Sequence, residues 1–233
     1  MSTSTASPEM RVEAEREQPA LVADKTSKFS RRYVVFIVAL TAAWGVLMNQ
    51  FGSSPIYWVM GPYSAGVCVA LLVARGHALR ARLRPTVKTV AIGVGMGALM
   101  TVCTYPAFDL ARRFFPALAA NVADLYRQSQ NERLGVALVA VVVILTAEEL
   151  LWRGAWFEAW VARIGPFKAC ALCVLSYALT QLCSGSFIVC LLAIVCGTVW
   201  TAMRYYTGSI VPSLIAHAIW TPTVILLIPV TWQ

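Results

Sequence analysis

The chain has 233 residues, of which 59% are apolar and 13% charged, and its mean hydropathy is +0.68. Soluble domains are close to half apolar and about a quarter charged, so this composition excludes an ordinary soluble globular domain and indicates a membrane protein. The net charge of +8 does not indicate nucleic-acid binding, because the Lys and Arg residues cluster in short segments beside apolar runs. That arrangement is typical of cytoplasmic loops in membrane proteins.

The N-terminal residues 1–30 are polar, carry mixed charge and show no apolar periodicity, which predicts a disordered cytoplasmic tail. The basic residues before the first apolar run place the N-terminus in the cytoplasm; they are Lys25, Lys28, Arg31 and Arg32. Residues 75–88 contain several Lys and Arg side chains and no acid, so this segment is also predicted to be cytoplasmic. Two membrane crossings between the two segments agree with both assignments.

The apolar runs predict about seven transmembrane helices, since about 20 apolar residues cross a bilayer. The predicted spans cover about 33–51, 56–74, 89–106, 135–160, 169–182, 187–203 and 210–230. In the third span, Gly93 and Gly97 form a GxxxG pair that favours close helix packing. Residues 107–134 mix charged side chains with aromatics and alanines, which predicts an extracytoplasmic amphipathic connection on the membrane surface. The predicted fold class is therefore all-α, a polytopic transmembrane helix bundle.

Two adjacent carboxylates lie deep inside the fourth predicted span. At helical rise, Glu148 lies roughly 20 Å into the bilayer, where each charge costs on the order of 3 kcal/mol. Glu149 and Arg153 are four residues apart and share a helix face, which predicts a buried ion pair. Glu148 points about 100° away from Glu149 around the helix, so Arg153 does not share its face. This geometry favours Glu148 as a general base, although a purely structural ion cluster is the competing interpretation.

Two further polar groups interrupt apolar helices. His217 lies in the last span between apolar neighbours, where a histidine is either a hydrogen-bonding residue between helices or part of a site. Tyr177 and Gln181 share a face of the fifth span. The CxxC formed by Cys170 and Cys173 has no second Cys pair or nearby His, and so predicts no zinc site.

The order and spacing of these residues resemble the CPBP family, the CAAX-prenyl-protease-like and bacteriocin-processing (Abi) intramembrane endopeptidases. The family pattern is a Glu-Glu-x-x-x-Arg helix, then Phe-x-x-x-His, then Gly-Ser followed by a helix with His-x-x-x-Asn. The matching residues are Glu148, Glu149 and Arg153 for the first motif and Gly208, Ser209 and His217 for the last. Trp152 and Gly154 also resemble bacterial members linked to protein sorting, such as myxosortases. The resemblance covers about residues 135–233.

The chain departs from the family pattern in the second and last motifs. The Phe and His of the second motif are Tyr177 and Gln181 here, and the Asn of the last motif is Thr221. A glutamine keeps a donor and an acceptor but does not exchange a proton near neutral pH, and it is a poor zinc ligand. The resemblance therefore implies a water molecule activated by Glu148, without metal or other cofactor. It also implies that Arg153 orients Glu149, and that His217, Gln181 and Thr221 polarise the carbonyl and stabilise the oxyanion.

The predicted function is an intramembrane endopeptidase that hydrolyses a peptide bond of a membrane-anchored protein or peptide, as in C-terminal processing or sorting. Its predicted location is a bacterial plasma membrane, with the lipid bilayer as partner and no nucleic acid. The predicted domains are residues 31–134 for the N-terminal helices and connection, and 135–233 for a CPBP-like catalytic helix core.

Two hypotheses from other functional classes stay open. Gln181 in place of the motif His favours an inactive family member that binds a peptide or lipid, for instance as an immunity protein. Transporters also use buried carboxylates, to relay protons. However, the sequence has neither an inverted repeat nor a matched pair of broken helices.

Overall fold

A computed structural model describes residues 30–50 and 56–230, and every regular element within these ranges is a helix. The helices are α2 (Arg31–Met48), α3 (Ile56–Arg82), α4 (Val87–Phe114), α5 (Pro116–Ser129), α6 (Leu134–Glu148), η1 (Glu149–Trp156), α7 (Phe157–Ile164), α8 (Pro166–Leu182), α9 (Phe187–Thr207), α10 (Val211–Pro222) and η2 (Thr223–Leu227). The segments η1 and η2 are π-helical. The all-α prediction is confirmed. The tail predicted over residues 1–30 lies outside the described residues, apart from Ser30, whose side chain caps α2.

Within the described ranges, five helices are long and apolar enough to cross a bilayer, and α6, η1 and α7 together form one of them, Leu134–Ile164. The predicted fifth and seventh spans are shorter apolar helices, Pro166–Leu182 and Val211–Leu227. The side chains that face outward are largely apolar, among them Val69, Val73, Val102, Val139, Phe167 and Val195. An apolar exterior on helices of this length indicates an integral membrane protein.

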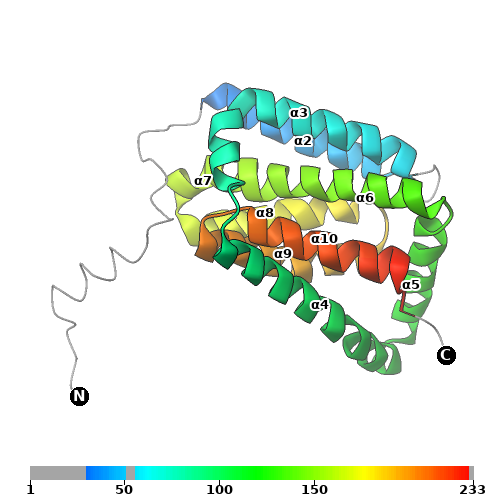
Figure 1. Cartoon of the computed structure of the whole chain (residues 1–233). Coiled ribbons are helices and arrows are strands. Elements are labelled where there is room, and N and C mark those ends of the chain that lie inside the picture. The colour runs from blue at the N-terminus through cyan, green and yellow to red at the C-terminus, as the bar shows by residue number, and fades with distance from the viewer. Residues whose placement is uncertain (1–29, 51–55, 231–233) are drawn as a thin grey trace, which may run out of the picture.

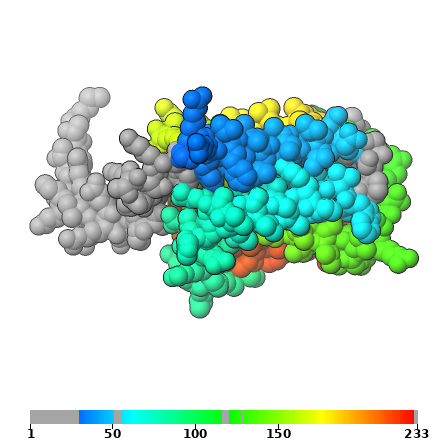
Figure 2. Space-filling model, turned by 90° about the horizontal axis from the view of Figure 1, so that it is seen from above, coloured from blue at the N-terminus to red at the C-terminus, as the bar shows by residue number. Residues whose placement is uncertain are grey.

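The helices form a layered bundle. In Figure 1, α2 and α3 lie side by side on one face, α6 lies beneath them, and α4 crosses the opposite face obliquely. Seen from above, α2 and α3 cover most of the face that is turned to the viewer (Figure 2). The main packing partners are α3 with α6, α8 with α9, and α4 with α10. As a result, α6, α8 and α10 each turn one face toward the interior of the bundle.

The start of α2, the α3–α4 junction, the α7–α8 turn and the α9–α10 turn gather at one end of the bundle (Figure 1). The basic residues Arg31 and Arg32, which begin α2, and the basic segment 75–88 therefore lie at the same end. At this end, Arg82 and Arg204 both pair with Glu158, at 3.1 and 3.4 Å. The opposite end is closed by α5.

We expect Arg84→Cys to react with a membrane-impermeant maleimide only after cells are opened, and Asp124→Cys on α5 to react in intact cells. Both side chains are exposed. Arg84 belongs to the α3–α4 junction and Asp124 to α5, which lie at opposite ends of the bundle (Figure 1), and the positive-inside rule predicts that the end rich in Lys and Arg is the cytoplasmic one. The measurement uses a background in which the native cysteines are replaced. Labelling of Arg84→Cys in intact cells would show that the protein has the opposite orientation to the one proposed.

Three elements differ from the sequence-based boundaries. Helix α3 continues past the predicted end at residue 74 to Arg82, with a kink at Arg75. Helix α4 does not end near Pro106 but continues to Phe114, because a membrane helix tolerates the hydrogen bond that an internal proline removes. The rest of the predicted amphipathic connection forms α5, whose apolar side chains Val122, Leu125 and Tyr126 are buried. The apolar face of α5 therefore packs onto the end of the bundle, against α9 and η2.

The predicted GxxxG pair packs α4 against α10. A Cβ atom at Gly93 would lie 2.8 Å from the Cβ of Ile215 and 2.9 Å from the carbonyl oxygen of Pro212. A Cβ at Gly97 would lie 3.0 Å from the Cα of Ala216. Only glycine leaves room for this backbone approach, which brings α10 and its His217 into the interior.

We expect Gly93→Ala to lower the free energy of unfolding by about 1–3 kcal/mol, the usual cost of overpacking. The control is Gly95→Ala on the same helix, where an added Cβ would have no heavy atom within 4 Å. Thermal unfolding in detergent compares the two variants. An equal loss of stability in both would mean that helix propensity, rather than contact with α10, explains the effect.

Candidate active site

The Glu-Glu-x-x-x-Arg motif lies where α6 changes into the π-helical segment η1. Glu149 and Arg153 are fully buried, and Arg153 donates to Glu149 Oε1 at 3.2 Å. The expected ion pair therefore forms inside the bundle. Arg153 also donates to the carbonyl oxygen of Gly197 at 3.3 Å, and its guanidinium lies over the rings of Tyr177 and Trp200. A π-helical turn inside an α-helix often marks a functional site.

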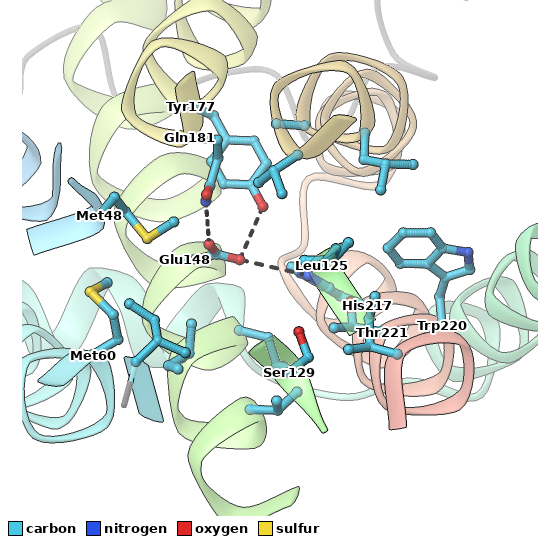
Figure 3. A pocket seen from close by; sticks show the side chains of 18 of the residues that line it. Met48, Met60, Leu125, Ser129, Glu148, Tyr177, Gln181, His217, Trp220 and Thr221 are labelled. Atoms are coloured by element: carbon cyan, nitrogen blue, oxygen red, sulfur yellow. Dashed lines mark hydrogen bonds and ion pairs between the residues drawn. The ribbon is translucent and has the colours of Figure 1, made fainter. Parts of the chain in front are cut away.

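Glu148 points away from Arg153 and toward α8. Its Oε1 accepts a hydrogen bond from Gln181 Nε2 at 2.8 Å, and its Oε2 accepts one from the Tyr177 hydroxyl at 3.1 Å. Figure 3 shows both donors reaching Glu148 from the same helix. Tyr177 and Gln181 reach it together because they are one helical turn apart on α8.

His217 on α10 connects the two carboxylates. Its Nδ1 lies 3.0 Å from Glu149 Oε1, and its Nε2 lies 3.7 Å from Glu148 Oε2. The imidazole stacks on the Trp200 ring with centroids 3.6 Å apart, which fixes its orientation. A left-handed glycine, Gly208 at φ 67°, ends α9 and lets the chain turn back into α10.

A cavity of about 190 Å³ opens beside these groups. Its polar lining comes from Glu148, Tyr177, Gln181, His217, Thr221, Ser129 and Tyr57. The remaining walls are apolar and include residues from α2, α3 and α5, such as Met48, Met60 and Leu125 (Figure 3). The N-terminal helices thus help to enclose a cavity whose polar motif residues all come from residues 135–233.

The structure brings the six predicted site residues close together. Some of them line the cavity, and the others lie behind its wall. Glu148, Gln181, His217 and Thr221 line the cavity. Glu149 and Arg153 do not line it. Because Glu149 contacts His217 and Arg153, it lies behind the cavity wall. Thr221 Oγ1 is buried and makes no hydrogen bond to any described residue.

Sequence reasoning missed several groups that shape the site. Trp200 and Gly197 on α9 looked like ordinary apolar helix positions, yet one stacks on His217 and the other accepts a hydrogen bond from Arg153. Arg204 is buried and donates to the backbone oxygen of Arg153 at 3.0 Å, and it pairs with Glu158. Arg204 and Glu158 are far apart in sequence and give no local signal, since the two meet only through helix packing.

The donor chemistry does not suit a metal ion. Among the described residues, no group of three or more His, Cys, Asp and Glu side chains is arranged to hold one. The groups around the cavity are one imidazole, one carboxylate, an amide and hydroxyls, whereas zinc sites use at least three Cys, His or acidic ligands.

The comparisons with known proteins give one match. Residues 130–222 match the family model of the Rce1-like type II CAAX prenyl endopeptidases. The chain thus carries an Rce1-like domain that begins just before α6 and ends with α10. Members of this family are intramembrane peptidases that depend on glutamate and do not require a metal. No curated protein and no solved structure shows significant similarity to the chain.

Proposed function

We propose, with the Rce1-like domain as the premise, that this protein hydrolyses a peptide bond of a membrane-associated protein or peptide with water activated by Glu148. The observation that carries the proposal is the cavity beside Glu148. Hydrogen-bonding groups on α8 and α10 line this cavity together with the Glu148 carboxylate. A site of this size with several polar partners is suited to an ordered water molecule.

Glu148 takes one proton from the attacking water, and the water oxygen bonds to the carbonyl carbon of the substrate. The carbonyl oxygen becomes an oxyanion, and when the C–N bond breaks the proton on Glu148 passes to the leaving amine. Glu148 suits this role because its two hydrogen-bond partners are neutral, whereas Glu149 is bound to Arg153. The base is therefore held in place by neutral donors, and the buried ion pair with Arg153 belongs to Glu149 instead.

Charge balance favours a single proton in the cluster of Glu148, Glu149, Arg153 and His217. Two carboxylates and one guanidinium leave one negative charge, so one added proton makes the buried cluster neutral. On His217, that proton lets Nδ1 donate to Glu149 while Nε2 donates toward the cavity. Nε2 and the Thr221 hydroxyl then provide donors for the oxyanion.

The apolar walls favour an uncharged, apolar stretch of substrate around the scissile bond. Of the described residues that line the cavity, Glu148 and His217 are the only titratable groups apart from tyrosines. A charged side chain of a substrate that packed against the apolar walls would lose its hydration without a counter-charge from them. We propose that C-terminal processing or sorting sequences, which lie at a membrane anchor, supply such stretches.

The activity is tested with purified protein in detergent or nanodiscs. The probes are an internally quenched farnesylated peptide ending in Cys-a-a-x, its unprenylated counterpart and a quenched peptide that joins an apolar segment to a basic tail. Mass spectrometry locates the cleaved bond. Binding of these peptides without cleavage would favour the alternative in which Gln181 marks an inactive, peptide-binding member of the family.

A further inference from the structure

The Tyr177 hydroxyl is a buried group that takes part in none of the proton transfers described above. Tyr177 is 5% exposed, and its hydroxyl lies 3.1 Å from Glu148 Oε2. An ionised carboxylate only accepts hydrogen bonds, so the phenol is the donor in this contact. The hydroxyl thus lies on the same carboxylate oxygen that is turned toward His217.

The ring of Tyr177 is held on several sides. The Trp152 ring lies against it with centroids 4.8 Å apart, and the Arg153 guanidinium lies 4.9 Å from its centroid. At Gly197 an added Cβ would come within 3.1 Å of the tyrosine Cδ1, so α9 leaves no space for the ring to swing toward it. The direction of the hydroxyl is therefore fixed by packing and does not depend on its contact with Glu148.

Each oxygen of Glu148 has one donor, and both donors come from α8. The terminal torsion of a glutamate side chain is broad, so one donor does not fix the rotation of the carboxylate plane. Gln181 Nε2 holds Oε1 at 2.8 Å, and Tyr177 holds Oε2 at 3.1 Å. Two donors at separate oxygens set both the position and the rotation of the carboxylate.

We infer that Tyr177 is a positioning residue, whose hydroxyl acts with the Gln181 amide to hold the Glu148 carboxylate in the orientation that faces His217 and the cavity. The inference rests on the proposed function, in which Glu148 is the base. The hydroxyl contributes little to packing, because a phenylalanine would keep the ring contacts with Trp152 and Arg153. Its effect on chemistry can therefore be separated from its effect on the fold.

The test is Tyr177→Phe, with Tyr63→Phe as the matched control. The Tyr63 hydroxyl donates to the Leu40 carbonyl oxygen at 2.5 Å, and Tyr63 lies outside the cavity lining. We expect Tyr177→Phe to lower kcat about 10- to 100-fold, the effect of losing one hydrogen bond to a charged group. KM should stay within about twofold. Tyr63→Phe should keep the wild-type kcat even if its thermal stability falls.

A spectroscopic readout needs no substrate. Infrared difference spectra between the wild type and Glu148→Gln identify the carboxylate stretch of Glu148. That band should shift in Tyr177→Phe and stay in place in Tyr63→Phe. An unshifted band, or a wild-type kcat in Tyr177→Phe while Glu148→Gln is inactive, would overturn the role of Tyr177 and leave the proposed base intact. Cleavage by Glu148→Gln at the wild-type rate would instead remove the proposed function and this inference with it.

Discussion

Replacing Glu148 with glutamine should abolish peptide cleavage and leave the fold unchanged. The loss in kcat should be at least about 10²- to 10⁴-fold, the usual contribution of a general base, because an amide does not accept the proton from water. The structure explains why the fold should persist. The amide oxygen of the new side chain can accept from Gln181, and its NH₂ group can donate to the Tyr177 hydroxyl, which rotates to suit.

The measurement is the rate of cleavage of the quenched peptides, with thermal unfolding of the same preparation as the control for folding. Glu132→Gln is the matched variant, because Glu132 is a partly exposed carboxylate that accepts from Trp58 Nε1 far from the motif. It should cleave at the wild-type rate. If Glu148→Gln is as active as the wild type, Glu148 is not the base and the protease mechanism is wrong.

Glu149→Gln should destabilise the protein by about 3–5 kcal/mol, the cost of leaving a buried charge without its partner. Glu149 Oε1 contacts both Arg153, at 3.2 Å, and His217 Nδ1, at 3.0 Å, and all of these side chains are buried. A neutral amide removes the only carboxylate that pairs with Arg153 among the described residues. The substitution should also lower activity, because His217 loses the acceptor that orients its ring.

Unfolding in detergent, induced by heat or by denaturant, measures the stability of the three variants. Glu149→Gln should be much less stable than Glu148→Gln and Glu132→Gln. The comparison is informative because all three changes replace a carboxylate by the same amide. They differ in whether the carboxylate has a buried cationic partner. Equal stability of Glu149→Gln and Glu148→Gln would show that the pair with Arg153 contributes nothing net to folding.

The sequence alone determined the fold class and the pairing within the motif. Apolar runs of membrane-spanning length have few structures other than helices, because the bilayer offers no hydrogen-bond partner to an unpaired backbone. The contact between Glu149 and Arg153 follows from helical periodicity, since residues four apart share a face whatever the helix packs against. Gly93 and Gly97 likewise indicated a close helix contact before its partner was known.

Other features were decided only by tertiary structure. Nothing local to the motif says that Glu149 lies behind the cavity wall while Glu148 faces it, because that depends on where α8 and α10 pack around η1. The same holds for Trp200 against His217 and for Arg204 against the Arg153 backbone. These contacts join helices that are far apart in sequence. Helical periodicity assigns each side chain to a face of its own helix, but only the packed bundle determines which faces meet and which of them enclose a cavity.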